Sequence, residues 1–171
     1  MTTDRRAATA SLVLRSAVGA TMIAHGVKHA RTLAGTAGWF KSIGFHKPEL
    51  QARTSAAVEI GTGAALVAGA ATPLAAAGVV ATMAVAARTV HARNGFFITA
   101  EGWEYVANLA AAAVALTGFG PGEYSIDHLL GLHRRLPTWG SMTIAAGLGL
   151  AGSALHLALY WREPTPNHEP S

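Results

Sequence analysis

The sequence contains no cysteine and few charged residues. Of its 171 residues, 13% are charged and 51% are hydrophobic, and the mean hydropathy is +0.32. The lack of cysteine excludes disulfides, thiolate nucleophiles and cysteine-held iron–sulfur clusters in this subunit. A soluble domain carries about 25% charged residues, whereas the smaller share here is clustered between long apolar runs. This pattern predicts an all-α, polytopic membrane protein.

The net charge of +4 and the isoelectric point near 10.0 do not indicate a nucleic-acid-binding protein. The basic residues lie at the ends of apolar runs, where they can contact lipid headgroups, and no basic stretch has interleaved aromatic residues. We expect the lipid bilayer as a partner and no nucleic acid. The arginine-, alanine- and glycine-rich composition is typical of a GC-rich bacterial genome, so we expect a multi-pass protein of the bacterial inner (plasma) membrane.

Five apolar runs are long enough to cross about 30 Å of hydrocarbon as helices. Residues 55–90 hold two of them, separated by a single turn signal at Thr72-Pro73, and predict a transmembrane helical hairpin. In chain order, we expect the helices at residues 10–30, 54–71, 73–90, 101–118 and 139–161. The predicted fold is therefore a transmembrane four-helix bundle with a fifth, C-terminal transmembrane helix.

The connecting segments contain shorter predicted elements. We expect a helix lying on the membrane within the loop at 31–53, and an amphipathic helix capped by Ser125 within the loop at 118–136. The predicted organisation is a polar N-terminal arm, a four-helix membrane domain, an additional transmembrane helix and a Pro-rich tail. Their boundaries are expected at residues 1–9, 10–132, 133–161 and 162–171 respectively.

Eight polar residues lie near the predicted helix ends that antiparallel packing brings into the same leaflet. They are His25, Lys28, Glu59, Arg88, His91, Glu101, Glu104 and Asn108. The opposite helix ends are almost purely Ala, Gly, Val and Leu, so we infer one polar cluster inside one half of the bundle. Buried charge must be paired. One alternative is a structural ion-pair network, in which Glu59 pairs with Lys28 or Arg88. The other is a site for a polar headgroup, such as a quinone ring. The pattern assigns no catalytic residue and no metal ligand.

The last predicted helix carries small residues at every fourth position. Ser141, Ala145, Gly149 and Ser153 form a small-xxx-small face, which lets another helix approach closely. Two partners for this face are open: the bundle of the same chain, or a helix of another subunit.

Several motifs resemble those of the DoxX family. His25-Gly26-Val27-Lys28 resembles an HG-x-K pattern at the end of the first helix. Further matches are Gly44-Phe45 with Pro48, Glu59 followed by Gly61 and Gly69, His91 with Gly95, and Gly118-x-Gly120-x-x-x-Tyr124-Ser125-Ile126-Asp127. The resemblance covers roughly residues 10–132 and implies a four-helix bacterial membrane protein.

The resemblance also implies a redox setting. Relatives form part of a thiosulfate:quinone oxidoreductase, and other members are described as membrane partners of a superoxide dismutase and a sulfurtransferase in oxidative-stress defence. We favour a non-catalytic accessory or organising subunit of a respiratory or oxidative-stress redox assembly, with a cytochrome complex, a superoxide dismutase or a sulfurtransferase as partner. The alternative is a membrane subunit of a quinone-linked oxidoreductase, with quinone as the cofactor. A b-type haem between His25 and His91, or a small-solute transporter, is less favoured, because no further haem signal, inverted repeat or broken helix is present.

Overall fold

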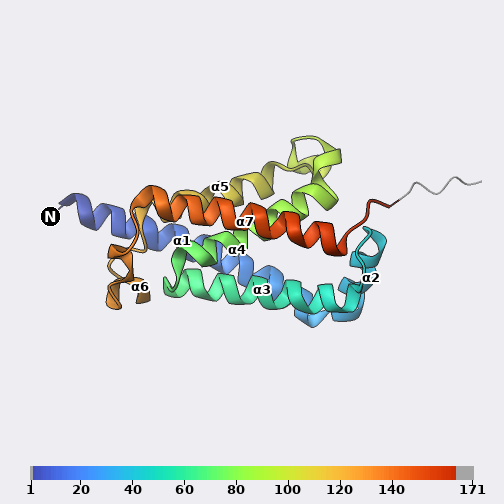
Figure 1. Ribbon diagram of the computed structural model, residues 1–171, viewed down its shortest axis with the longest axis horizontal. Helices are drawn as coiled ribbons and strands as arrows, with labels where there is room; N and C mark the ends of the chain where they lie inside the picture. Colours follow the sequence, from blue (N-terminus) through green and yellow to red (C-terminus); the bar gives the residue numbers. More distant parts are fainter. Residues whose placement is uncertain (1, 165–171) are drawn as a thin grey trace, which may run out of the picture.

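The long helices run alternately in opposite directions along one common axis (Figure 1). The computed structural model describes residues 2–164 and contains seven α-helices joined by short helical turns and loops in that range. The five long helices are α1 Thr2–Arg31, α3 Pro48–Ala68, α4 Thr72–Ala86, α5 Glu104–Phe119 and α7 Thr138–Tyr160.

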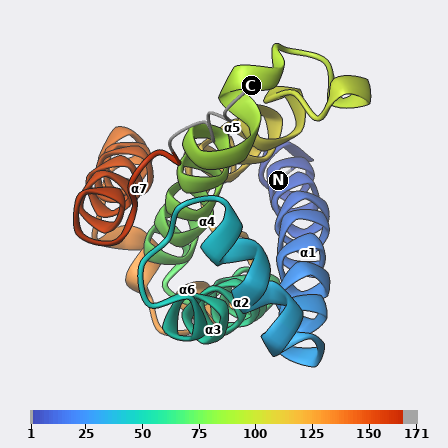
Figure 2. The same cartoon turned by 90° about the vertical axis from the view of Figure 1, so that its right-hand side faces the viewer.

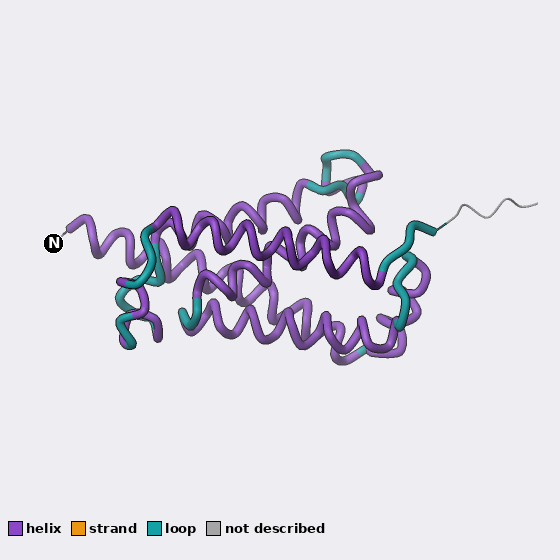
Figure 3. Tube along the Cα trace, in the orientation of Figure 1, coloured by secondary structure: helices purple, strands orange, loops and turns teal. Residues whose placement is uncertain are grey.

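The shorter elements lie at the two ends of the bundle, where the loops also gather (Figure 3). They are the helices α2 Leu33–Ser42 and α6 Ile126–Leu129, the π-helical turn η1 Ala87–His91, and the 3-10 turns η2 Ala92–Asn94, η3 Ile98–Ala100 and η4 Leu132–Arg134. The predicted helix within the first loop is therefore present as α2. Ser125 caps α6, because its side chain accepts a hydrogen bond from the His128 backbone nitrogen at 3.1 Å.

Three helices in the described range are long and apolar enough to cross a membrane, by length and composition. They span Arg5–Arg31, Thr72–Asn94 and Thr138–Tyr160. α5 is apolar but has only 16 residues, and α3 has 21 residues but carries Glu49, Arg53 and Glu59. The prediction of an all-helical chain with membrane-capable helices is confirmed, and the crossing of the membrane by all five helices stays a prediction.

Four of the long helices form a closed ring. α1 contacts α3, α3 contacts α4, α4 contacts α5, and α5 contacts α1. α7 lies outside this ring against α4 and α5, on the side opposite α1 (Figure 2). Aliphatic side chains fill the ring, among them Val18, Met22, Leu66, Val79 and Leu116.

The backbones of α1 and α3 touch where the two helices cross. A Cβ atom on Gly63 would lie 2.5 Å from the carbonyl oxygen of Gly19 and 2.9 Å from the backbone nitrogen of Ile23. A Cβ atom on Gly26 would lie 2.9 Å from the Cβ of Glu59. Small residues permit this spacing in membrane helices, where van der Waals packing holds neighbouring helices together. These glycines therefore set the distance between α1 and α3.

Some helix boundaries differ from those expected. α7 agrees with the expected span within one residue at each end, but α3 begins at Pro48 rather than near residue 54, because proline is suited to the first turn of a helix. α5 begins at Glu104, because Glu101 has a left-handed backbone with φ 59°. α1 begins at Thr2, so the expected arm is helical over the described residues 2–9. The expected tail lies mostly outside the described residues.

The contact between α1 and α3 generates a first prediction. Gly63→Ala should destabilise the protein by about 1–3 kcal/mol, because the added methyl group meets backbone atoms of α1 that cannot rotate away. Gly61→Ala, two residues earlier on the same helix, is the control, since a Cβ atom there meets nothing within 4 Å. It should leave stability unchanged or raise it by up to about 1 kcal/mol. Thermal unfolding in one detergent compares the two, and equal shifts would contradict the packing described.

Candidate functional site

Glu59 is buried between α1 and α3 and is paired with His29. Its side chain is almost fully covered, with the residue 4% exposed. The Oε1 atom accepts a hydrogen bond from the Ser55 hydroxyl at 2.7 Å and lies 3.3 Å from His29 Nδ1. The Oε2 atom has no hydrogen-bond partner among the described residues. The contact with His29 differs from the pairing with Lys28 or Arg88 that the ion-pair alternative expected.

Arg88 and His91 lie on the π-helical turn η1, at the end of α4. The Arg88 guanidinium lies 3.2 Å from a Glu163 carboxylate oxygen and stacks over the Trp161 ring, 4.6 Å from its centroid. Both charged side chains of this pair are more than half exposed, so the ion pair adds little stability. His91 Nδ1 lies 2.6 Å from the backbone carbonyl oxygen of Glu101.

Among the remaining predicted residues, Glu104 and Asn108 make contacts within their own segment, and His25 lies near a ring of α5. A Glu104 carboxylate oxygen accepts a hydrogen bond from the Ile98 backbone nitrogen at 3.0 Å, and Asn108 donates to the Glu104 carbonyl at 3.0 Å. The His25 ring lies 6.4 Å from the Tyr105 ring, centroid to centroid. Lys28 is exposed. The eight residues are therefore divided among several separate contacts around one end of the bundle.

The opposite end of the bundle contains a buried arginine and a buried aspartate that the sequence-based prediction missed. Arg15 is 1% exposed and donates a hydrogen bond from Nη2 to the Tyr124 carbonyl. Asp127 is 3% exposed, and its carboxylate interacts electrostatically with Arg15. The two carboxylate oxygens accept hydrogen bonds from the backbone nitrogens of Ala71 at 2.7 Å and Thr72 at 2.8 Å, so Asp127 caps the start of α4.

The sequence predicted that the helix ends opposite the polar cluster are almost purely apolar. The buried Arg15 and Asp127 show that this prediction is wrong for this end of the bundle. Gly69 explains how Arg15 fits there. This residue ends α3 with φ 64°, and a Cβ atom on it would collide with the Arg15 guanidinium and with Ser125. The Asp127 backbone nitrogen donates to the Gly69 carbonyl at 2.9 Å. A single base within an apolar run, together with the Tyr124–Asp127 motif, was the signal for this site.

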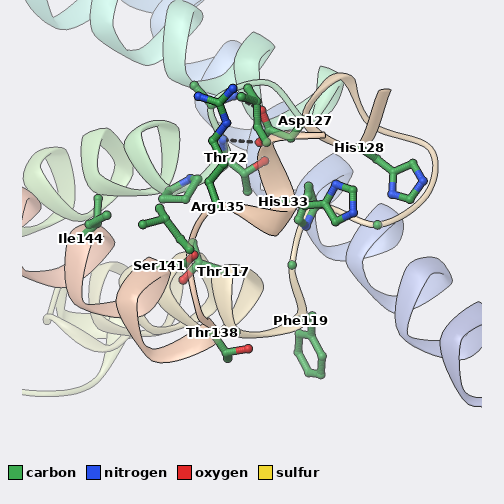
Figure 4. A pocket seen from close by; sticks show the side chains of 18 of the residues that line it. Thr72, Thr117, Phe119, Asp127, His128, His133, Arg135, Thr138, Ser141 and Ile144 are labelled. Carbon is green, nitrogen blue, oxygen red and sulfur yellow. Dashed lines mark hydrogen bonds between the residues drawn. The ribbon is translucent and has the colours of Figure 1, made fainter. Parts of the chain in front are cut away.

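A cavity of about 760 Å³ lies beside Asp127 (Figure 4). Its walls come from the start of α4, the end of α5, the loop with α6 and η4, and the start of α7. Figure 4 shows Arg135 beside Thr72 and Asp127, with the rings of His128 and His133 close together on another side. These two rings are stacked, with centroids 4.4 Å apart. None of the eight predicted cluster residues lines this cavity.

The small-residue face of α7 packs against α4 of the same chain. Ser141, Ala145, Gly149 and Ser153 are all buried. A Cβ atom on Gly149 would lie 2.6 Å from the Val80 Cβ, so the two helices are in close contact. The sequence left open whether this face packs on the bundle of the same chain or on a helix of another subunit. In the structure, it packs on the bundle of the same chain.

The segment after α7 is fixed to the loop between α2 and α3. Phe45 and Trp161 form an isolated antiparallel β-bridge, and Trp161 Nε1 donates to the Ile43 carbonyl at 2.7 Å. Gly44 has φ 95°, and a Cβ atom on it would collide with the carbonyl oxygen of Arg162. The Gly44-Phe45 motif therefore binds the segment that follows α7.

No group of three or more His, Asp or Glu side chains in the described part of the chain is arranged to hold a metal ion. The all-helical fold, with three helices suited to span a bilayer, is that of a membrane protein. Residues 10–92, just under half of the chain, match the model of the DoxX family, and this match supports a DoxX-family membrane protein. This confirms the resemblance. The matched span contains the HG-x-K, Gly44-Phe45 and Glu59 motifs and ends before the Tyr124–Asp127 motif. Neither the curated proteins nor the solved structures contain a match.

The buried aspartate generates a second prediction. Asp127→Ala should destabilise the protein by about 3 kcal/mol or more, because it removes the cap of α4 and leaves the Arg15 charge buried without its counter-charge. Glu123→Ala, an exposed acid in the same loop, should change stability by less than about 0.5 kcal/mol. Thermal unfolding of the two variants in the same detergent measures this difference. A mild effect of Asp127→Ala would mean that the Arg15–Asp127 contact does not hold this end together.

Proposed function

We propose that this DoxX-family protein is a non-catalytic membrane subunit that organises a respiratory or oxidative-stress redox assembly. In this proposal, α1, α3, α4, α5 and α7 all cross the bacterial inner membrane. The assembly partners are a cytochrome complex, a superoxide dismutase or a sulfurtransferase. Because the chain contains no cysteine, any thiol or cluster chemistry belongs to these partners.

The observation that carries this proposal is the dispersal of the ionisable residues near one end of the bundle. A catalytic site requires several groups converging on one place where a substrate atom can sit. Here Glu59 contacts His29 between α1 and α3, Arg88 contacts the exposed Glu163, and Glu104 contacts backbone in its own loop. These contacts hold the protein's own elements together, which supports a structural role for them.

The outer surface of α7 gives further support. Its small-residue face is occupied by α4, while Leu148, Leu155 and Leu159 are 54–61% exposed. An apolar surface of this kind is stable only against lipid or against the helices of another membrane subunit. An organising subunit needs such a surface in addition to its own core.

Purification from the native membrane tests the proposal. The tagged protein, extracted in mild detergent, should retain a cytochrome, dismutase or sulfurtransferase subunit in stoichiometric amount, as measured by quantitative mass spectrometry. The isolated protein should show no oxidoreductase activity with thiosulfate and quinone. An unrelated multi-pass protein with the same tag is the control. Recovery of the protein alone, with extractable quinone bound to it, would contradict the proposal.

A membrane subunit of a quinone-linked oxidoreductase is the second candidate. The observation in its favour is Glu59, whose Oε2 atom is buried without a hydrogen-bond partner in the described range. A buried acid within a membrane helix that keeps one oxygen unsatisfied is costly, and ionisable residues at such depth are typical of proton-handling positions. His29 and Ser55, which contact the other carboxylate oxygen, would then carry the proton to or from it.

The second candidate predicts a strong effect of Glu59→Gln. If Glu59 transfers protons during quinone reduction, the variant should lose about 100-fold or more in the rate of electron transfer to quinone. Glu49→Gln, which changes an exposed acid on the same helix, is the matched control and should keep the full rate. Thermal unfolding of both variants shows whether they fold. Full activity in a folded Glu59→Gln variant would remove this role.

A further inference from the structure

A strongly basic surface lies at the end of the bundle that carries α2. Residues 28–53 run from the end of α1 through α2 into α3, and they contain five Lys and Arg residues but only one acid, Glu49. Their net formal charge is therefore +4, which equals the net charge of the whole chain. The five bases, named the α2 bases below, are all exposed: Lys28, Arg31, Lys41, Lys47 and Arg53.

The protein itself does not neutralise this surface. Within residues 2–164, none of the α2 bases forms an ion pair. Two other bases at the same end differ in this respect, since Arg88 and Arg93 lie 3.2 Å and 3.7 Å from the carboxylate oxygens of Glu163. A surface with unpaired charges of one sign attracts a partner of the opposite sign. The α2 bases therefore favour an anionic partner.

α2 lies across the end of the bundle, which is the position where a spanning bundle meets the lipid headgroups. Figure 2 shows it running from the end of α1 across the ends of other helices. One side of α2 is buried against α3. Beside the bases, Leu33 and Trp39 of α2 are 37% and 43% exposed, and Leu50 of α3 is 47% exposed. Tryptophan and long basic side chains next to apolar residues are typical of the headgroup region of a bilayer.

An anionic lipid surface fits this composition better than an acidic protein does. Three of the five α2 bases are lysine, a residue that is depleted in protein–protein interfaces. Clusters of about four to eight Lys and Arg residues next to membrane helices are typical of surfaces that bind acidic headgroups. The exposed Leu33, Trp39 and Leu50 can enter the boundary between the headgroups and the acyl chains.

The distribution of the bases also indicates an orientation. Arg162, after α7, lies at the same end as α2, because its backbone nitrogen donates to the Gly44 carbonyl at 3.0 Å. Of the thirteen Lys and Arg residues, eight lie at this end: the α2 bases with Arg88, Arg93 and Arg162. Of the other five, Arg15 is buried. Short connections rich in Lys and Arg face the cytoplasm, where the leaflet surface is negatively charged.

We propose that the end of the bundle with α2 faces the cytoplasm and that the α2 bases bind the anionic phospholipid headgroups of the cytoplasmic leaflet. Leu33, Trp39 and Leu50 lie at the boundary between these headgroups and the acyl chains. The inference rests on the proposed crossing of the inner membrane, and it does not depend on the redox role or on any protein partner.

Cysteine labelling tests the orientation. Because the chain has no cysteine, Gly38→Cys on α2 and Glu123→Cys at the opposite end can be labelled without background. Both positions are exposed, and a Cβ atom on Gly38 meets nothing within 4 Å. In intact spheroplasts, a membrane-impermeant maleimide should label Glu123→Cys, and it should label Gly38→Cys only after the membrane is disrupted. The reverse pattern would overturn the proposal. Equal labelling of both in intact spheroplasts would overturn the membrane crossing on which it rests.

Lipid-dependent thermal unfolding tests the binding of headgroups. The full-length protein in detergent should be stabilised more by added phosphatidylglycerol than by phosphatidylcholine. The double variant Lys41→Gln with Arg53→Gln should weaken the apparent affinity for phosphatidylglycerol about 25-fold, because each base near an anionic lipid surface contributes about 1 kcal/mol. Arg5→Gln with Arg6→Gln is the matched control, since it removes two exposed bases from the opposite end, and it should change the affinity far less.

Both double variants place glutamine, a good helix former, at exposed helical positions, so both should fold. Equal effects of the two lipids on the natural protein, or equal losses in the two double variants, would overturn the binding of headgroups by the α2 bases. An acidic protein is the other possible occupant. If Lys41→Gln with Arg53→Gln released a stoichiometric protein partner while the preference for phosphatidylglycerol stayed unchanged, the surface would belong to that partner and the proposal would fail.

Discussion

The close contact between α1 and α3 is the constraint on which the other parts of the structure depend. On α1 it is made by residues spaced alternately by four and three positions: Arg15, Gly19, Met22, Gly26 and His29. This spacing keeps one side of a helix facing a neighbour along its whole length. The glycines in the middle bring the backbones together. Because the helices are so close, Arg15 at one end lies over Gly69, and His29 at the other end reaches Glu59.

The ionisable residues at the two ends of this contact are about 21 Å apart along α1, from the rise of 1.5 Å per residue. These residues, Arg15 and His29, each meet a part of α3 that only one register of α1 against α3 can supply. Arg15 requires Gly69 at the end of α3, and His29 requires Glu59. If α1 were shifted by one residue relative to α3, Arg15 and Glu59 would be buried without these contacts. An uncompensated buried ion costs several kcal/mol. The polar ends therefore select the register, while the glycines provide the packing.

The sequence identified the helices better than it identified their contacts. Apolar runs between turn signals located α7 within one residue at each end, and Ser125 was correctly expected to cap a helix. The predicted cluster assumed that residues at the same depth share a site. Depth follows from position along the helix, but the direction of a side chain depends on the rotation of each helix against its neighbours. Glu59 consequently meets His29 rather than Lys28. Arg15 was missed because its acceptor, the Tyr124 carbonyl, lies 109 residues further along the chain.

α7 changes what the four-helix ring can do. Its small-residue face covers α4, the segment after it pairs with the Gly44-Phe45 motif, and its first turn forms one wall of the cavity beside Asp127. The ring alone would leave that side of the start of α4 uncovered, and the first turn of α7 makes it a partly open cavity. α7 also places an uncapped helix start opposite the one that Asp127 caps. The helix that lies outside the ring is therefore held against it along one face and at its C-terminal end, and it supplies a cavity wall that the ring by itself does not possess.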